Sequence, residues 1–295
     1  MNEAATIASC LESLDANCAG VPARILLLLN GSTDGTRAIA EGLRLRHAAL
    51  EIHASRGADK ANAINQYVHR LRDPGALAFF VDGYITAHAG ALPAMERALA
   101  AQPHAHVASA VPVSGRSAAH MRAQLLKGGG ISGNLFACTP RFLDRLVAAG
   151  LRLPLFLYRG DGLIGSMAAH DLDAMGTPWD DTRLIGVAEA TYAFRPLSPF
   201  RWRDVKRQLR REVRQARGAL ESAAVKALIY ERGYAALPRD ADTLVRDFVA
   251  AKGLPPAGLK ARILRHLALR ELRAAPPPAD DPRLAIEQVF ARAPG

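Results

Sequence analysis

In the stretch LLLLNGSTDGT, residues 26–36, a run of apolar residues is followed directly by a cluster of small and polar residues. Residues 25–29 are all apolar, as expected for a strand covered on both faces of a sheet. In open α/β sheets, ligands bind beyond the carboxyl ends of the strands, so residues 30–36 are the first candidate for a binding site. The same residue types also suit a plain strand-to-helix turn with a capped helix. The loop is neither G-x-G-x-x-G nor a Walker loop.

Helix-like and strand-like segments alternate on either side of this loop. Apolar periodicity predicts helices over residues 4–15, 36–46, 59–72, 90–101, 140–149 and 161–173, and strands over 25–29, 50–53, 76–81, 106–111 and 184–194. This alternation predicts a three-layer α/β domain with a mostly parallel sheet. From residue 201 onward the pattern is helical and basic, with a Pro/Ala-rich break at 275–282. We therefore expect an α/β domain over residues 1–198 and a basic helical region over 199–295.

The composition limits the class of protein. Of the 295 residues, 49% are hydrophobic, which is enough for a substantial core. The net charge of +10 suits polyanions such as nucleic acid, anionic lipid or a diphosphate, although a solvated basic surface gives the same balance. No apolar run approaches the roughly 20 residues of a membrane span, and no secretory signal is visible. Cys10, Cys18 and Cys138 form no C-x-x-C, which favours a reduced cytosol over a disulfide scaffold or a zinc site.

A second polar strand end follows at Asp82, directly after the apolar residues 76–81. Two such ends on one sheet could face one crevice, where acidic residues suit a ribose, a base edge or a divalent metal. Residues 128–133 contain four glycines, which indicates either backbone close to a ligand or a mobile loop.

Four segments resemble, in order, the motifs of family 2 glycosyltransferases. They are NEAATIASCLESL (2–14), NGSTDGT (30–36), DKANAIN (59–65) and FFVDGYITAHAGAL (79–92). GGGISGNLFACTPRFLDRLVAAG (128–150) and YRGDGLIGSM (158–167) resemble the acceptor side of that family more weakly. Each motif is weak alone, but the order and spacing are fairly specific. The resemblance implies a GT-A fold, with a Rossmann-like, mostly parallel sheet flanked by helices.

The resemblance also implies a chemistry. Family members invert the anomeric centre of a nucleotide-sugar, most often a UDP-sugar, while a carboxylate deprotonates the acceptor hydroxyl and Mg²⁺ or Mn²⁺ stabilises the leaving diphosphate. Carried over position by position, the resemblance places seven residues at the nucleotide-sugar site: Glu3, Asn30, Ser32, Asp34, Lys60, Asn65 and Asp82. It also places Asp82 at the metal and makes Asp161 the general base. The expected acceptor is a saccharide or a lipid-linked molecule of a bacterial-type envelope pathway.

This chain departs from the family pattern in several places. The family's first strand would precede Asn2, and its absence should leave two unpaired strand edges, so we expect a mis-set start or a shortened chain. Asn30 stands where the family often has Asp. Tyr84 replaces the second acid of the metal motif, so metal binding is expected to be weak, water-mediated or absent. Gly160 stands where Glu is common before Asp161, and Asp161 could instead cap its helix.

Residues 201–217 contain eight Arg or Lys and two acidic residues. Trp202, Val205, Leu209 and Val213 form a narrow apolar stripe at helical spacing. One interpretation is a solvated helix that packs this stripe on the domain. The other is an interfacial helix that holds a cytoplasmic enzyme on the anionic inner face of a membrane. The few aromatic residues argue against nucleic acid.

Two alternative functions remain from the sequence. Tyr84 and the missing strand favour a catalytically silent family member that binds a nucleotide or a glycan as a partner subunit. The basic residues 201–295 allow a helical adaptor for membrane or nucleic acid. Turnover of a nucleotide-sugar would exclude the silent member, and deletion of residues 201–295 would test the adaptor.

Overall fold

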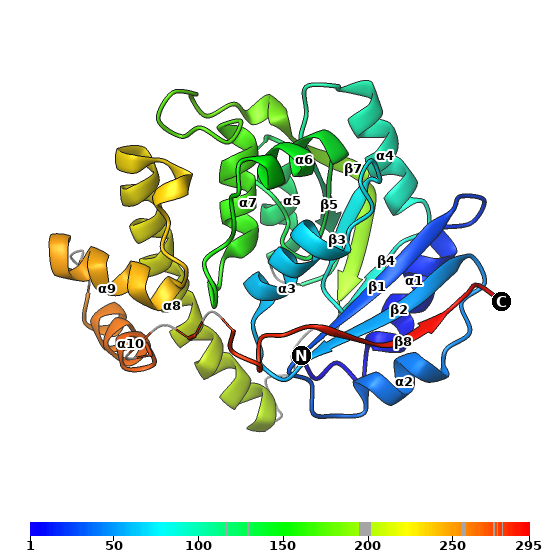
Figure 1. Cartoon of the computed structure of the whole chain (residues 1–295), viewed down its shortest axis with the longest axis horizontal. Helices are drawn as coiled ribbons and strands as arrows, with labels where there is room; N and C mark the ends of the chain where they lie inside the picture. The colour runs from blue at the N-terminus through cyan, green and yellow to red at the C-terminus, as the bar shows by residue number, and fades with distance from the viewer. Residues whose placement is uncertain are drawn as a thin grey trace.

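The computed structural model describes residues 1–115, 117–128, 130–194, 202–254, 258–273, 275, 277–278 and 280–295, with only the backbone of residues 202–211. These residues form two sheets with helices around them (Figure 1). The strands are β1 (Ala23–Asn30), β2 (Ala48–Ser55), β3 (Ala78–Val81), β4 (Ile85–Ala87), β5 (Val107–Pro112), β6 (Leu135–Cys138), β7 (Leu184–Phe194) and β8 (Glu287–Arg292). The helices are α1 (Ile7–Asn17), α2 (Thr36–Gly42), α3 (Lys60–Gln66), α4 (Ala91–Ala101), α5 (Ala118–Leu125), α6 (Pro140–Ala148), α7 (Gly160–Ala169), α8 (Trp202–Arg232), α9 (Ala241–Lys252) and α10 (Leu259–Arg270), with short turns η1 (Tyr67–Leu71), η2 (Asp181–Arg183) and η3 (Tyr234–Ala236).

The strand order is β1-β2-β8 in the first sheet and β3-β6-β5-β7-β4 in the second. This mixed α/β arrangement confirms the predicted fold class. The expectation of mostly parallel pairing is wrong, because only β1–β2 and β5–β7 are parallel, while four pairs in the described chain are antiparallel. β6 is antiparallel to β5 because the chain leaves β5 and enters β6 at the same end of the sheet, without a crossover to the opposite end.

Helix starts follow the caps that the sequence provides. The Asp59 carboxylate accepts the N–H of Asn62 at the start of α3. At α6, the Thr139 hydroxyl accepts an N–H of the first turn and Pro140 supplies a preset φ angle. Asp240 caps α9 in the same way as Asp59 caps α3. These local signals explain why the predicted helices lie where they were expected.

The second sheet is covered on both faces, and β6 shows how. Its residues point alternately into two core clusters, with Phe136 and Cys138 in one and Leu135 and Ala137 in the other. The first cluster takes in α6, α7 and part of α8, and the second takes in α1 and α4. The result is the predicted helix–sheet–helix layering.

The last residues return to the first sheet. β8 pairs antiparallel with β2, and Figure 1 shows it alongside β2 at the C-terminus. The expectation of a helical region over residues 199–295, broken at 275–282, is therefore wrong at 287–292, where Val289 and Phe290 pack on the core beside the first sheet. The helix expected over 36–46 ends early, at Gly42, and Arg292 takes the carbonyls of Glu41 and Leu43 as hydrogen-bond acceptors.

β1 and β3 are both edge strands. Each has one partner in the described chain, β2 for β1 and β6 for β3. The link expected between these edges and a strand before Asn2 stays a prediction. The side chains of Leu26, Leu27 and Leu28 on β1 are only partly buried.

The C-terminal helices share the main core of the α/β part. Leu220, Ala224, Val225 and Ile229 of α8 are buried, and the last three join the cluster that contains α7. The proposed division at residue 198 stays a prediction. None of the helices in the described ranges has both the length and the apolar character needed to cross a bilayer. Trp202, Val205 and Leu209 of the expected apolar stripe lie outside the residues with described side chains.

Asp15 ties α1 to the first sheet and gives a pH-dependent test of the fold. Its buried carboxylate accepts the N–H groups of Arg46 and His47, both at 2.8 Å, and of Ala48 at 2.9 Å. Burial alone would raise the pKa of Asp15, but these donors outweigh it and the pKa lies below its ordinary value. The stabilisation is complete above the unfolded-state pKa of about 4 and disappears as the pH falls through the native pKa.

We expect Asp15→Asn to lower the free energy of unfolding by about 1–3 kcal/mol at neutral pH. The difference in free energy of unfolding between the variant and the unmodified protein should become smaller below about pH 4. Urea unfolding at several pH values measures both. Glu12→Gln, on the exposed side of the same helix, is the matched control and should change little. A difference that stays constant down to pH 2 would contradict the assignment.

Candidate active site

An ammonium group and a carboxylate face each other at the end of β3. Lys60 is the first residue of α3, and its Nζ lies 2.6 Å from Asp82 Oδ1 and donates to the carbonyl of Gly133 at 3.2 Å. Asp82 follows β3 directly, and its N–H donates to the carbonyl of Asn134. The Lys60 side chain is 51% exposed and that of Asp82 is 19% exposed. A positive charge is therefore presented to solvent beside a partly buried carboxylate.

Tyr84 completes the surroundings of Asp82. Its hydroxyl donates to Asp82 Oδ2 at 3.0 Å, and Asn134 Nδ2 donates to both the Tyr84 hydroxyl at 2.7 Å and Asp82 Oδ2 at 3.3 Å. Loss of hydration around the hydroxyl and the nearby Asp82 charge raise the pKa of Tyr84 well above its ordinary value. The phenol is therefore protonated at neutral pH and acts as a donor to Asp82.

Asp161 stands directly over Gly133. It lies in the first turn of α7, and a Cβ placed at Gly133 would be only 1.8 Å from Asp161 Oδ2 and 2.7 Å from its Cγ. Only glycine leaves room for the carboxylate at this position. Among the described residues, the Asp161 carboxylate has no hydrogen-bond or ion-pair partner. Gly133 thus brings Asp161 together with Lys60 and Asp82, as the sequence predicted for the site.

The Gly133 segment is held from beneath by a chain of buried hydroxyls. Tyr192 of β7 is fully buried and donates to Asn134 Oδ1 at 3.1 Å. Ser132 Oγ lies 3.0 Å from the Tyr192 hydroxyl, and the Ser132 N–H donates to Ser109 Oγ on β5 at 3.1 Å. The second sheet therefore fixes the backbone on which Asp161 and Lys60 converge.

The loop at 30–36 binds the N-terminal segment of the chain. Ser32 Oγ accepts the N–H of Asn2 at 3.2 Å, and Asp34 Oδ2 accepts the N–H of Ala4 at 3.1 Å. Asp34 Oδ1 also accepts from the hydroxyl and the N–H of Thr36, and the hydroxyl bond is the main reason that the pKa of Asp34 is lowered. The loop is therefore a turn in which Asp34 bonds to Thr36 and which holds the N-terminal segment, and its contact with a nucleoside stays a prediction.

Glu3 lies between the two polar strand ends. Its N–H donates to the Thr36 hydroxyl at 2.9 Å, and its Oε2 accepts from Thr6 at 3.2 Å. The Thr6 hydroxyl also contacts the carbonyl of Gly83, at 3.3 Å. A Cβ at Gly83 would lie 3.7 Å from Glu3 Cγ. The structure thus places Glu3 next to Gly83, the residue that follows Asp82, and its predicted contact with the donor stays a prediction.

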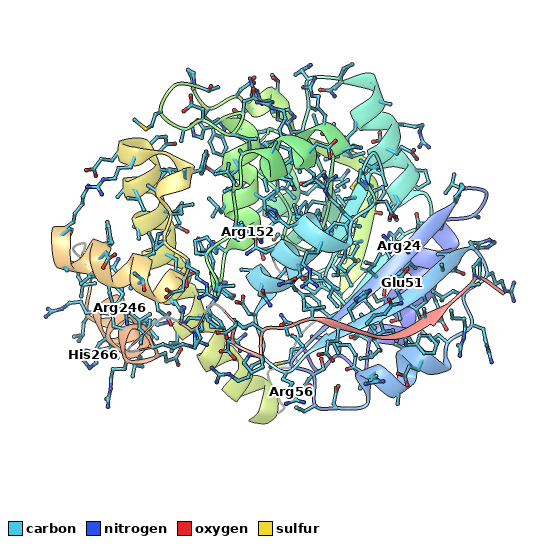
Figure 2. The ribbon with its side chains drawn as sticks, in the orientation of Figure 1. Arg24, Glu51, Arg56, Arg152, Arg246 and His266 are labelled. Atoms are coloured by element: carbon cyan, nitrogen blue, oxygen red, sulfur yellow. The ribbon has the colours of Figure 1, made fainter. Side chains whose placement is uncertain are left out.

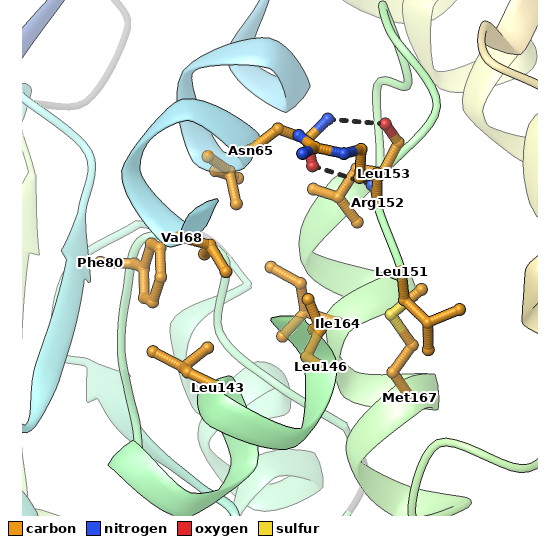
Figure 3. A pocket seen from close by; sticks show the side chains of 11 residues that line it. Asn65, Val68, Phe80, Leu143, Leu146, Leu151, Arg152, Leu153, Ile164 and Met167 are labelled. Atoms are coloured by element: carbon orange, nitrogen blue, oxygen red, sulfur yellow. Dashed lines mark hydrogen bonds between the residues drawn. The ribbon is translucent and has the colours of Figure 1, made fainter. Parts of the chain in front are cut away.

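Asn65 is turned into the protein instead of toward solvent. Its side chain is buried, donates to the carbonyl of Leu153 at 2.8 Å and accepts the N–H of the same residue at 2.9 Å (Figure 3). The cavity beside it is walled mainly by apolar side chains (Figure 3). Asn65 therefore braces the segment that leads to α7, and its predicted contact with the donor is untested.

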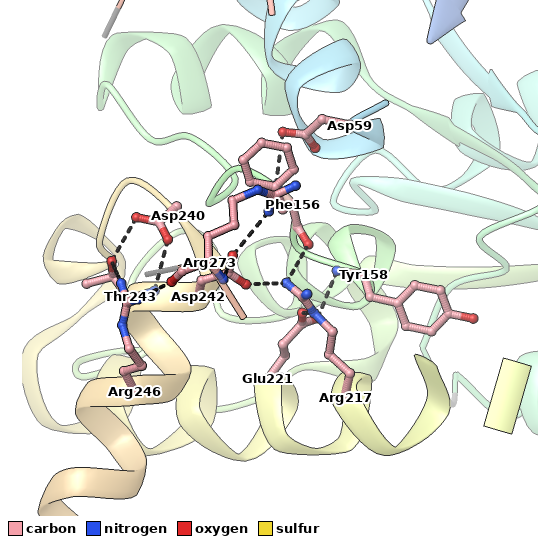
Figure 4. Close-up of polar contacts among 10 residues, drawn as sticks. All are labelled: Asp59, Phe156, Tyr158, Arg217, Glu221, Asp240, Asp242, Thr243, Arg246 and Arg273. Carbon is pink, nitrogen blue, oxygen red and sulfur yellow. Dashed lines mark hydrogen bonds and ion pairs between the residues drawn. The ribbon is translucent and has the colours of Figure 1, made fainter. Parts of the chain in front are cut away.

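Asp59, next to Lys60, joins three parts of the chain. Besides capping α3 at Asn62, its carboxylate accepts the N–H of Phe156 at 2.9 Å, and its own N–H donates to Asn30 Oδ1 at 2.6 Å. Phe156 has a positive φ of 62°, and the Arg273 guanidinium lies 3.4 Å above its ring. Figure 4 shows Asp59, Phe156 and Arg273 close to one another.

The C-terminal helices hold the same segment from the other side. Glu221 of α8, which has no exposed surface, accepts the N–H of Tyr158 at 2.8 Å. Arg217 pairs with Glu221 at 2.7 Å and with Asp242 of α9 at 2.6 Å, and Arg273 pairs with Asp242 at 3.1 Å (Figure 4). The residues before Asp161 are thus fixed by α3 on one side and by α8 and α9 on the other.

The polar groups around Asp82 do not fit a divalent cation. One carboxylate oxygen faces the Lys60 ammonium and the other accepts from Tyr84 and Asn134. Mg²⁺ and Mn²⁺ prefer several oxygen ligands, chiefly carboxylates and carbonyls, and a protonated phenol is a poor one. The described residues contain no cluster of three or more His, Cys, Asp or Glu able to hold a metal. The expected metal at Asp82 stays untested, and this donor set does not favour it.

The sequence was also compared with known proteins. Residues 1–147 match the model of Glycosyl transferase family 2. The chain belongs to this family. No curated protein matched the chain. The matched range contains Glu3, Lys60, Asp82 and Gly133 of this glycosyltransferase, while Asp161 lies beyond it.

Several residues that shape the site of this glycosyltransferase were not predicted. Gly133 and Asn134 lie inside a motif that was quoted, but the close approach of Asp161 to Gly133 depends on how α7 packs. Asp59 carries a local capping signal, since it precedes a helix. Tyr192 is one apolar-looking position in a long strand, and nothing nearby in the sequence marks its hydrogen bond.

The contact between Gly133 and Asp161 gives the first test of the site. We expect Gly133→Ala to displace the Asp161 carboxylate and to lower glycosyl transfer by about 100-fold, as a displaced catalytic group does. Release of nucleoside diphosphate from a nucleotide-sugar in the presence of extracted membrane lipids and saccharides measures the rate.

Gly162→Ala is the matched control, because the atom nearest to its added Cβ would be 4.0 Å away. It should keep the rate. Equal rates in the two variants would show that the position of Asp161 over Gly133 is not needed for turnover.

Proposed function

We propose that the protein is an inverting hexosyltransferase that moves a sugar from a nucleotide-sugar, with UDP as the first candidate, to a saccharide or lipid-linked acceptor. The observation that carries this proposal is the convergence at Gly133. The Asp161 carboxylate, which has no partner among the described residues, lies where a Cβ of Gly133 would be, and the exposed Lys60 ammonium contacts the Gly133 carbonyl. A base and a cation placed this close suit a displacement in which an acceptor loses a proton and a diphosphate leaves.

In the proposed reaction, Asp161 accepts the proton of the acceptor hydroxyl as its oxygen bonds to the anomeric carbon. The bond from that carbon to the diphosphate breaks with its electron pair, so the nucleoside diphosphate leaves as an anion and the anomeric centre is inverted. Among the described residues the Asp161 carboxylate has no hydrogen bond to give up before it takes the proton, and this supports the role.

We infer that the leaving diphosphate is stabilised by Lys60 and not by a divalent cation. The ammonium is half exposed, and Asp82 fixes it at 2.6 Å. Tyr84 and Asn134 in turn orient Asp82. A lysine is an established phosphate ligand in proteins and acts as a point charge. Glu3, Asn30, Ser32 and Asp34 remain candidates for the nucleoside end of the donor.

The base assignment predicts a loss of rate without a loss of donor affinity. Asp161→Asn should lower turnover by about two to four orders of magnitude while the Kd of the nucleotide changes little. Steady-state kinetics and calorimetry measure the two quantities. Asp247→Asn, an exposed carboxylate on α9, is the control and should keep the full rate. Retention of most of the rate in Asp161→Asn would remove the assignment.

The donor assignment is tested by calorimetric titration with UDP and with GDP, each in EDTA and in Mn²⁺. We expect one of the two nucleotides to bind, with the same Kd in EDTA and in Mn²⁺. Lys60→Gln should weaken this binding about 10- to 100-fold, the value of a hydrogen bond to a charged group. Lys226→Gln makes the same charge change at an exposed site on α8 and should bind like the unmodified protein. Binding that requires Mn²⁺ would contradict the role of Lys60 and would support the divalent cation expected from the sequence.

A catalytically silent family member is the second candidate, and Tyr84 at the metal position favours it. Such a protein would bind a nucleotide or a glycan through the same residues without turnover. Nucleotide binding together with no release of nucleoside diphosphate, across a range of donor sugars and acceptors, would support it over the transferase.

A further inference from the structure

Helix α10 carries a stripe of exposed apolar side chains. Leu259, Ile263 and Leu267 are 74%, 54% and 41% exposed, and their spacing of four residues places them on one face of the helix. The opposite face packs on α8, with Ala268 buried at 1%. Single exposed apolar residues are common, but an ordered stripe along one helix indicates a surface that binds something.

Basic residues flank this stripe. The helix contains Lys260, Arg262, Arg265 and Arg270 and no acidic residue. At 100° per residue, Lys260 lies on one side of the stripe, Arg262 lies on the other, and Arg270 lies at its C-terminal end. His266 lies on the same outer face, and Figure 2 shows it at the end of the molecule opposite the first sheet.

α10 also adjoins the most basic part of the sequence. Lys260 Nζ pairs with Glu212 of α8 at 3.1 Å, so the start of α10 lies beside this residue. Glu212 belongs to residues 201–217, a stretch with eight Arg or Lys and two acids in the sequence. The apolar stripe is therefore joined to a part of the chain whose sequence is strongly basic.

We propose that α10 binds an anionic membrane surface, with Leu259, Ile263 and Leu267 in the boundary between headgroups and acyl chains. Lys260, Arg262 and Arg270 would contact lipid phosphates. An apolar stripe flanked by Lys and Arg is the pattern of helices that lie in the plane of a membrane interface. The combination of apolar and electrostatic contacts supplies the two signals that stable attachment needs. The proposal does not depend on catalysis.

Charge argues against the other occupants. A second copy of the chain would bring the same basic residues together across the interface, which is unfavourable. Nucleic acid would satisfy the charges but leave the apolar stripe in water, and α10 has no aromatic side chain on which bases could stack. An anionic lipid surface satisfies both the stripe and its flanks.

The test is co-sedimentation of the full chain with vesicles of phosphatidylcholine, with and without phosphatidylglycerol. We expect binding to the anionic vesicles, at least about tenfold weaker binding to the neutral ones, and weakening by salt. The combined change Leu259→Ser, Ile263→Ser and Leu267→Ser should reduce binding at least about tenfold. Its control changes Val21, Val113 and Met175 to Ser, three apolar residues that are exposed elsewhere.

A second pair of variants separates charge at this site from net charge. Lys260→Gln, Arg262→Gln and Arg270→Gln together should weaken binding to anionic vesicles, whereas Arg37→Gln, Arg44→Gln and Arg97→Gln should weaken it far less. Thermal unfolding checks that each protein is folded. Titration with UDP separates this proposal from the proposed function, because the α10 variants should bind the nucleotide unchanged.

Three results would overturn the proposal. The first is vesicle binding that the triple Ser variant of α10 leaves unchanged, and the second is equal binding to neutral and anionic vesicles. The third is a protein that binds no vesicles but forms a dimer in sedimentation velocity, where the triple Ser variant of α10 is a monomer. Binding to duplex DNA that does not depend on the apolar stripe, in the absence of vesicle binding, would likewise assign the surface to nucleic acid.

Discussion

The buried carboxylate of Asp59 is the interaction on which both sides of the site depend. It is 3% exposed, and burial raises the pKa of Asp59, so a charge at this position needs strong partners. Its partners are backbone N–H groups at the start of α3 and at Phe156. One of these elements carries Lys60 and the other leads to Asp161. The relative position of Lys60 and Asp161 therefore depends on the Asp59 side chain, together with the contacts that Asn65 and Glu221 make to the same segment.

The substitution at Tyr84 has a simple electrostatic counterpart. A metal motif with two carboxylates and one divalent cation is neutral, and so is the pair formed here by Asp82 and Lys60. With a protonated phenol in place of the second acid, the Lys60 ammonium is sufficient to balance the charge of Asp82. Its exposed side is the reason that we propose it as the cation for the diphosphate.

Much of the fold could be predicted because its signals are local. Apolar runs marked β1, β3 and β5, and capping residues such as Thr139 marked helix starts. β8 was missed because a short strand inside a Pro-rich tail has little periodicity of its own, and its pairing with β2 spans most of the chain. The residues of the site were likewise predictable only where a local motif contains them. Asp161 and Lys60 stood in motifs, whereas the contact of Asp161 with Gly133 and the outward face of α10 depend on tertiary packing.

The position of β8 also constrains how the chain is made. β2 ends at Ser55, and the strand that covers its outer edge begins at Glu287. A ribosome adds about 5–20 residues per second, so the nascent first sheet waits on the order of ten seconds or more with that edge open. Unpaired edges recruit other strands during this interval. The outer edge of β2 is therefore expected to stay open to other strands until synthesis of the chain is nearly complete.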